Sequence, residues 1–120
     1  MNKFIGKIHT IKNEESINLV EIDIGGFIIN AVTLQLNRSF ETGHNVTAIC
    51  KETEVALHIT DHKLIGIENY IPVTIREIKK GRIFTEIGLS SPIGEFRSIA
   101  TNLSITETNL DVKDKLLALI

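Results

Sequence analysis

Four histidines and one cysteine are the side chains here that could hold a transition metal or act as a catalyst: His9, His44, His58, His62 and Cys50. His58 and His62 have the i, i+4 spacing of two ligands on one helix face, but they span a predicted strand end and a linker. Because no H-E-x-x-H pattern and no second cysteine accompany them, we do not expect a zinc site. No serine, histidine and aspartate occupy a recognisable nucleophile elbow, so we predict that the protein is not an enzyme.

The composition limits the partners and the compartment. The chain has 120 residues and a formal charge of −2, from 13 basic and 15 acidic residues, which is not the charge of a duplex-binding protein. No apolar stretch approaches the roughly 20 residues of a membrane-spanning helix, and the N-terminus lacks the pattern of a signal peptide. A single cysteine cannot form an internal disulfide and favours a reducing compartment. We therefore expect a soluble cytoplasmic protein without nucleic-acid or membrane partners.

Short alternating segments predict a β fold. In residues 20–24 the apolar side chains face one way and both acids face the other, as in a half-buried strand. Residues 46–49 and 55–59 are runs of the same kind. Gly25 and Gly26 lie between two such runs, where a hairpin turn requires positive φ. The spacing of a capping box at residues 104–107 and a segment at 36–41 predict only short helices. The predicted fold class is all-β with short helices.

An internal repeat organises the chain. At an offset of 67 residues, many apolar and polar positions of the first half recur in the second half. The offset becomes 68 after the loop at residues 90–94, which pairs Thr33 with Thr101. It becomes 70 after the second short helix, which pairs Cys50 with Ile120. The residues that match at an offset of 67 are Asn2, Phe4, Ile8, Ile11, Lys12, Val20 and Ile22 with Asn69, Ile71, Ile75, Ile78, Lys79, Ile87 and Leu89.

The repeat predicts two units and one incomplete sheet. The units span residues 1–62 and 67–120, with a junction near residues 61–66. Nothing in the second copy matches residues 51–60, so the last strand of the second unit is either missing or supplied by a partner. Units this small bury little surface alone, which favours mutual burial and oligomerisation.

The repeated pattern resembles a known family over essentially the whole chain. Each unit is similar to the molybdenum-pterin-binding-protein (Mop) domain, or molbindin, of the wider TOBE class. Residues 46–55 (VTAICKETEV) are similar to the family segment V-T-A-x-x-K-S/T-S/T-x-V, and residues 68–72 (ENYIP) are similar to its R-N-x-L-x opening. The other stretches that carry the resemblance are residues 2–8, 20–26 and 31–33.

The resemblance implies a fold, a ligand and an assembly. It implies two tandem OB-like small β-barrels that bind molybdate or tungstate at interfaces of a homo-oligomer, with a trimer favoured and a dimer as the alternative. The function that it implies is intracellular storage or buffering of the oxyanion. Such a dianion needs donors from several directions: backbone N–H groups, hydroxyls, an amide and one lysine.

The resemblance also implies particular site residues. Lys51 and Thr53 match the family's lysine and hydroxyl positions, and Asn2 and Asn69 match its opening asparagine. Ordinary structural roles compete with these assignments, because an exposed lysine is commonly only solvated and asparagine commonly bonds its own backbone at a turn. Thr33 and Thr101, at strand ends, are more typical of helix caps than of ligands.

Two departures from the family pattern lead to a second hypothesis. Glu52 occupies a position that is usually Ser or Thr, and Glu68 occupies the position of the family's arginine. A carboxylate beside a dianion costs electrostatic repulsion. The alternative is therefore a ligand-free TOBE-type module for assembly or regulation, associated with molybdate transport. Single-stranded nucleic-acid binding, common among OB-like barrels, is disfavoured because the chain has one Tyr, five Phe and no Trp.

Overall fold

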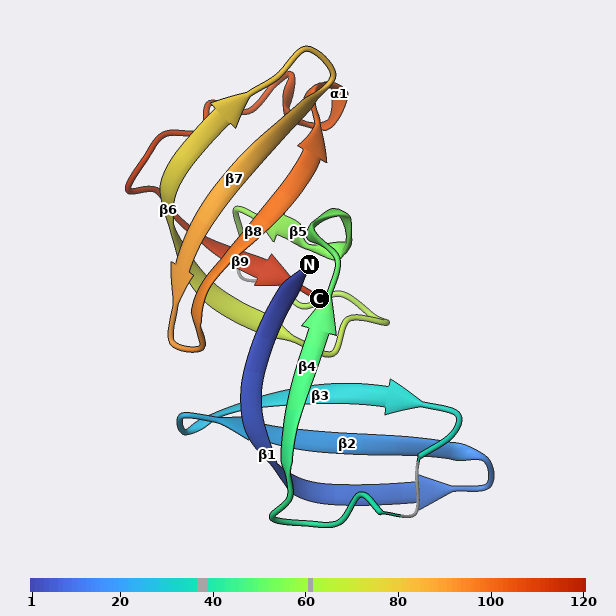
Figure 1. Cartoon of the computed structure of the whole chain (residues 1–120). Coiled ribbons are helices and arrows are strands. Elements are labelled where there is room, and N and C mark those ends of the chain that lie inside the picture. Colours follow the sequence, from blue (N-terminus) through green and yellow to red (C-terminus); the bar gives the residue numbers. More distant parts are fainter. Residues whose placement is uncertain (37–38, 61) are drawn as a thin grey trace. The chain divides into compact units, whose positions relative to one another are not determined.

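The computed structural model describes residues 1–36, 39–60 and 62–120 and consists mainly of β-strands (Figure 1). This confirms the predicted fold class. Among the described residues, no helix is long and apolar enough to cross a bilayer. The elements, in chain order, are β1 (Asn2–Glu14), β2 (Ile17–Ile24), β3 (Phe27–Thr33), β4 (Asn45–Cys50), the 3₁₀ turn η1 (Glu52–Glu54), β5 (Ala56–His58), β6 (Tyr70–Lys80), β7 (Phe84–Ser91), β8 (Gly94–Thr101), α1 (Asn102–Ile105) and β9 (Lys115–Leu119).

Backbone contacts divide the chain into two compact units. One unit contains residues 3–48, and the other contains residues 1–2 together with residues 49–120. The repeat predicts a boundary between residues 62 and 67. The two compact units of the structure instead meet between residues 48 and 49. The difference arises because the end of the first repeat packs within the second unit.

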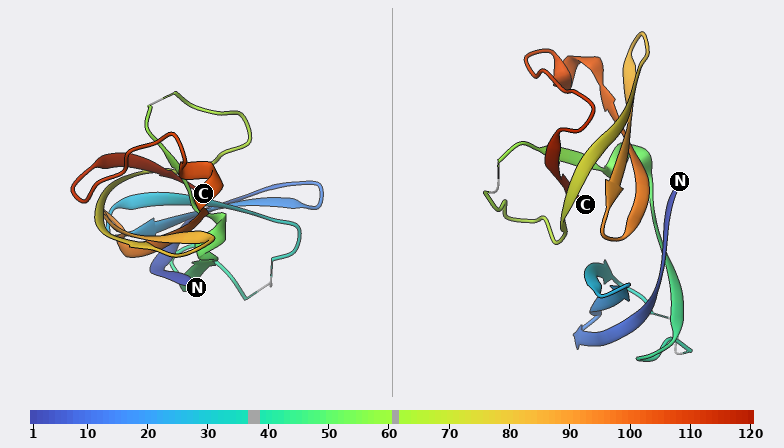
Figure 2. Two further views of the ribbon diagram at one scale, coloured as in Figure 1. Left: turned by 90° about the horizontal axis from the view of Figure 1, so that it is seen from above. Right: turned by 90° about the vertical axis from the view of Figure 1, so that its left-hand side faces the viewer.

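The unit of residues 3–48 contains a curled antiparallel sheet in the order β3-β2-β1-β4 (Figures 1 and 2). Its buried side chains include Phe4, Ile8 and Ile22, in line with the alternation along each strand. The hairpin between β2 and β3 turns at Gly25 and Gly26, whose φ angles are 60° and 94°. Two positive φ values are typical of the two-residue turn that matches the twist of the strands.

The other unit contains a curled five-stranded sheet in the order β5-β9-β6-β7-β8. Its core is the best-buried part of the chain, because Ile71, Ile75, Ile87 and Leu89 are almost completely inaccessible to solvent. Burial of one such aliphatic side chain stabilises the folded state by about 1.5–3 kcal/mol. Of the candidate site residues, Lys51 and Thr53 precede β5, and Asn69 directly precedes β6.

The last strand of this five-stranded sheet comes from the first repeat. β5 pairs antiparallel with β9, with Ala56 opposite Leu119 and His58 opposite Leu117. The hydroxyl of Ser98, on β8, donates a hydrogen bond of 2.7 Å to the carbonyl of Val55 and fixes the start of the strand. The position beside β9 is thus occupied by a strand of the same chain.

The two repeats have matching backbone irregularities. β1 and β2 lose register between Ile8 and Thr10, and β6 and β7 lose register between Ile75 and Glu77, 67 residues later. Ile8 donates its N–H to the carbonyl of His44 at 3.0 Å, and Ile75 donates to the carbonyl of Asp114 at 2.9 Å, which is an offset of 70 for the acceptors. Both sequence offsets therefore correspond to equivalent backbone positions.

The predicted offset of 68 after residues 90–94 is wrong. The hairpin of β7 and β8 pairs Ser91 with Gly94, so its turn has two residues, like the turn between Ile24 and Phe27. Neither hairpin contains an insertion, and the offset stays 67 along β8. Thr33 therefore corresponds to Ala100 rather than to Thr101.

The short helices differ from their predicted positions. α1 begins at Asn102, and Thr101 is its N-cap, because its side chain accepts a hydrogen bond from the N–H of Ser104 at 3.2 Å. Ser104 is thus inside the helix rather than at its cap, and the predicted role of Thr101 as a helix cap is confirmed. Of the predicted helix at residues 36–41, residues 37 and 38 lie outside the described part, and residues 36 and 39–41 are not helical. Thr33 accepts from the N–H of Gln35 in a local turn instead.

Candidate functional site

The segment after β4 carries two of the predicted site residues, Lys51 and Thr53. Lys51 has extended backbone angles and immediately precedes η1, and its N–H donates to a carboxylate oxygen of Glu54 at 2.8 Å. The carbonyl of Lys51 accepts from the N–H of Glu54 at 3.0 Å. These two bonds hold the turn in shape. Lys51 is exposed, and within the described residues its ammonium group forms no ion pair. A positive charge is thus available beside a fixed turn.

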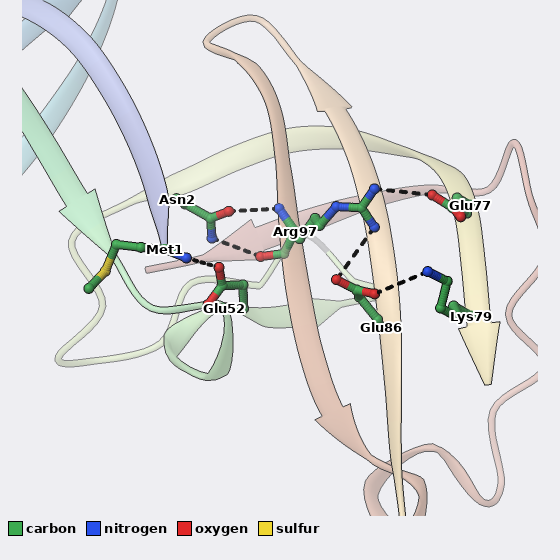
Figure 3. A network of polar contacts seen from close by, with 7 residues as sticks. All are labelled: Met1, Asn2, Glu52, Glu77, Lys79, Glu86 and Arg97. Carbon is green, nitrogen blue, oxygen red and sulfur yellow. Dashed lines mark hydrogen bonds and ion pairs between the residues drawn. The ribbon is translucent and has the colours of Figure 1, made fainter. Parts of the chain in front are cut away.

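Asn2 has a structural role in this arrangement (Figure 3). Its side chain is 6% exposed; its Nδ2 donates to the carbonyl of Arg97 at 2.8 Å, and its Oδ1 accepts from the N–H of Arg97 at 2.9 Å. The Nδ2 group also lies 3.8 Å from the sulfur of Cys50. These contacts use both amide hydrogens and one carbonyl lone pair, which leaves little capacity for another ligand. Asn2 therefore fastens the start of β1 to the edge strand β8.

Asn69 occupies the equivalent position in the second repeat. It is 7% exposed, its Nδ2 donates to the carbonyl of Ile120 at 3.3 Å, and its backbone exchanges two hydrogen bonds with Ile120. Ile120 matches Cys50 in the repeat, and each asparagine thus contacts the matching residue of its own repeat: Cys50 at the end of β4, or Ile120 directly after β9. The bonds of Asn2 to the backbone of Arg97 are additional to this shared contact.

A neighbouring positive group compensates the negative charge of Glu52. Its carboxylate forms an ion pair and a hydrogen bond with the N-terminal ammonium of Met1 (Figure 3). That hydrogen bond lowers the pKa of Glu52, so the carboxylate stays ionised at neutral pH. The neighbouring positive charge offsets part of the repulsion expected between Glu52 and an anion. Glu68 is exposed, as a solvated carboxylate would be.

Thr53 lies at a cavity of about 550 Å³ in the same unit. The cavity lies between η1, β5, β8 and α1, and its lining includes Val55, Ile87, Ser98 and Leu116. Among the described residues that line it there is no lysine, arginine or histidine, and Glu54 is the one that carries a charge. Because a dianion requires cationic or N–H donors, this cavity lacks the lining of an oxyanion site. Lys51 and Thr53 are thus neighbours in the chain, but only Thr53 lines the cavity.

The metal-binding residues considered from the sequence do not come together. Within residues 1–36, 39–60 and 62–120, no three histidine, cysteine, aspartate or glutamate side chains form a cluster. His58 instead bonds the hydroxyl of Thr60 at 2.7 Å, and His44 lies 3.9 Å from a carboxylate oxygen of Glu41. Cys50 is half-buried, and this burial raises the pKa of its thiol, which is therefore protonated at neutral pH.

Sequence reasoning did not find Arg97, a residue of β8 that contacts Asn2 through its backbone and two glutamates through its side chain. Its backbone binds Asn2, and its guanidinium lies 3.2 Å from a carboxylate oxygen of Glu77 and 3.6 Å from one of Glu86 (Figure 3). Lys79 lies 4.0 Å from Glu86 and extends the network. Arg97 has no equivalent arginine at the matching position in the first repeat, Asn30, so the repeat gave no signal for it.

Comparison with known proteins finds similarity among solved structures. No protein-family model and no curated protein sequence matches the chain. Among solved structures, a similar one is that of the cytoplasmic molybdate-binding protein ModG, in a crystal form with molybdate bound. The TM-score is 0.89 at 27% sequence identity, and the match covers 99% of this chain and 89% of that one. The chain therefore shares the OB-like, two-unit β fold of ModG, as the sequence predicted.

Proposed function

We propose that this protein binds molybdate or tungstate reversibly in the cytoplasm and that it stores or buffers the oxyanion without chemical change. The observation that carries this proposal is the similarity to ModG over 99% of the chain, since that protein was solved with molybdate bound. A TM-score of 0.89 supports the proposal because the two chains follow a similar backbone course over most of their length.

The segment around Lys51 supports the proposal chemically. Lys51 is exposed at the start of η1, and the turn is held by its hydrogen bonds with Glu54. A lysine beside an ordered turn can make charge-assisted hydrogen bonds to a doubly charged oxyanion. Thr53, two residues further on, adds a hydroxyl. Because Asn2 and Asn69 already bond the backbone, we propose that they shape the site and have only a limited role as direct ligands.

We further propose that the binding site is completed in a homo-oligomer, with a trimer favoured and a dimer as the alternative. One lysine and one hydroxyl are too few donors for a tetrahedral anion, which favours a site that groups of a neighbouring subunit complete. Ligand binding then stabilises the assembly by mass action. Light scattering with and without molybdate should show a higher or more persistent subunit count in its presence. An unassociated subunit that binds molybdate at full strength would contradict this part of the proposal.

Isothermal titration with molybdate, tungstate and sulfate tests the binding itself. We expect binding of molybdate and tungstate, with sulfate discriminated by its smaller size at equal charge. Lys51→Met should weaken binding by roughly 10- to 100-fold, because a hydrogen bond to a charged group contributes about 1.5–3 kcal/mol. Lys63→Met is the matched control, since Lys63 is also exposed and lies outside the candidate segment. Absence of heat with all three oxyanions would refute the proposal.

Glu68 favours the second candidate function, a ligand-free assembly or regulatory module associated with molybdate transport. Its exposed carboxylate occupies the position of the family's arginine and replaces an attractive charge by a repulsive one. The double variant Glu52→Ser and Glu68→Arg separates the two functions. A wild type without affinity and a variant with affinity would establish a lapsed site, whereas measurable wild-type affinity would exclude it.

A further inference from the structure

A second cavity, of about 420 Å³, lies where β6 meets β7 and β9 in the five-stranded sheet. Its lining includes three polar side chains, one from each of these strands: Thr74, Ser90 and Lys115. Neither Lys51 nor Thr53 lines it, so it is separate from the segment to which the proposed function assigns molybdate. No role has yet been given to these three side chains.

The register of the sheet places the three side chains in one row. Thr74 lies opposite Lys115 of β9 on one side and opposite Ser90 of β7 on the other. Residues directly opposite each other share a face of the sheet, with Cβ atoms about 4.5–5.5 Å apart. One ammonium group and two hydroxyls are therefore neighbours. The next residue of the row, Glu95, lies opposite Ser90 on β8, and its carboxylate forms an ion pair with Arg76.

These three polar groups are available to a ligand. Among the residues that the structure describes, no hydrogen bond or ion pair engages the ammonium of Lys115 or the hydroxyls of Thr74 and Ser90. Ser91 differs, because its hydroxyl, which also lines the cavity, donates to the carbonyl of Gly94 at 2.7 Å. The row thus offers one positive charge and two hydroxyl donors, and all three can turn toward an anionic group.

The first repeat does not contain this set of donors. The matching residues there are Lys7, Asp23 and Asn45, at the offsets of 67 and 70. Asp23 has a carboxylate where Ser90 has a hydroxyl, and Asn45 is uncharged where Lys115 has an ammonium group. An anion at the matching place would be repelled by the carboxylate. The donor row is therefore a property of the second repeat and not of the fold that both repeats share.

We propose that this cavity binds a small organic monocarboxylate. One ammonium balances one negative charge, and the hydroxyls of Thr74 and Ser90 donate to the carboxylate oxygens beside Lys115. The volume lies within the roughly 300–1,000 Å³ of small-molecule sites, so the ligand has a body beyond its charged group. The rings of Pro72 and Pro92, which are exposed and line the cavity, give that body an apolar surface to cover.

Titration of the full chain by NMR tests the class of ligand. The probes are benzoate, cyclohexanecarboxylate and hexanoate at constant ionic strength; acetate has the charge without the body, and benzyl alcohol has the body without the charge. We expect saturable shifts of the amide signals of Thr74, Ser90 and Leu116 with the three probes and much weaker shifts with both controls. No shift with any probe, or equal shifts with benzyl alcohol, would overturn the proposal.

Substitutions in the row test the position of the site. Lys115→Met should weaken benzoate binding about tenfold, because it removes a charge-assisted hydrogen bond. Lys80→Met is the matched control, since Lys80 is an exposed lysine of β6 that does not line the cavity. Ser90→Asp places the carboxylate of the first repeat in the row and should abolish binding, while the sheet tolerates this residue at the matching position. Wild-type affinity in Lys115→Met or in Ser90→Asp would overturn the proposal.

Molybdate is the probe that separates this site from the proposed function. It has two charges and no apolar body, so we expect it to leave the signals of Thr74 and Ser90 unchanged at concentrations that saturate its own site. Shifts of these two signals with molybdate and with none of the carboxylates would indicate a second oxyanion site and overturn the proposal. The carboxylate titration requires no molybdate, so failure of this site and failure of the proposed function are distinguishable.

Discussion

Asn2→Ala is the substitution that most directly separates a structural role of this asparagine from a ligand role. The Asn2 side chain is 6% exposed and makes hydrogen bonds of 2.8 and 2.9 Å with the carbonyl and the N–H of Arg97. β8 is the edge strand of its sheet, so no strand of the described part of the chain pairs with these two backbone groups on that side. Alanine removes both bonds and leaves the backbone of Arg97 to water.

The expected loss follows from the two hydrogen bonds. Each contributes a net stabilisation of about 0.5–1.5 kcal/mol, so Asn2→Ala should lower the free energy of unfolding by roughly 1–3 kcal/mol. The melting temperature should fall by about 5–15 °C for a domain of this size class. Asn2→Asp should be at least as harmful, because it keeps the acceptor for the Arg97 N–H but places a carboxylate oxygen against the Arg97 carbonyl.

Urea and thermal unfolding without any oxyanion provide the assay. Asn13→Ala is the matched control, because Asn13 is exposed, bonds the side chain of Asn18 at 3.0 Å, and its loss should change stability by no more than about 0.5 kcal/mol. If Asn2→Ala is no less stable than Asn13→Ala, the structural role of Asn2 is wrong. Unchanged stability combined with lost molybdate affinity would identify Asn2 as a direct ligand.

Three further substitutions test other parts of the structure. Ser98→Ala removes the hydroxyl that bonds the buried carbonyl of Val55, and urea unfolding should show a loss of about 1–3 kcal/mol. Gly6→Ala would place a Cβ 2.4 Å from a carbonyl oxygen of β2, so the strands must separate and the melting temperature should fall. The hydrogen bond from Thr10 lowers the pKa of Glu21, because it favours the ionised carboxylate. The stabilisation from this bond is therefore present at neutral pH and is lost as the pH falls through the lowered pKa and the carboxylate is protonated. Thr10→Ala should therefore raise the pKa of Glu21 in an NMR titration, and should destabilise at neutral pH but not in acid.

Local patterns predicted the strands and the duplication correctly. The alternation at residues 20–24 and the Gly25–Gly26 turn depend on neighbours within a few positions, and the structure has β2 and a two-residue hairpin there. The offset of 67 corresponds to the same loss of register in β1 and β6. The offset of 68 was wrong because similar residues, Thr33 and Thr101, end the strands at different register positions. Sequence similarity alone does not fix register.

The long-range partners were not predictable from the sequence. That β5 pairs with β9 depends on two segments about 60 residues apart, and the repeat indicated only that a strand was lacking. Asn2 and Arg97 are 95 residues apart, so the sequence near Asn2 gave no sign that its amide bonds an edge strand. For the same reason, the resemblance assigned Asn2 to a ligand position, while its buried bonds indicate a framework role. The exposure of Lys51 agrees with both a ligand and a solvated side chain.

The transfer of β5 into the sheet of the following repeat makes the two halves interdependent. A fragment of residues 67–120 would form a sheet in which β9 is an unpaired edge strand and the hydrogen bond between Ser98 and Val55 is absent. A nascent chain would likewise have to retain residues 55–58 in an unpaired state until β9 leaves the ribosome. Residues 67–120 therefore do not form a self-sufficient module, although the sequence reads as two similar copies.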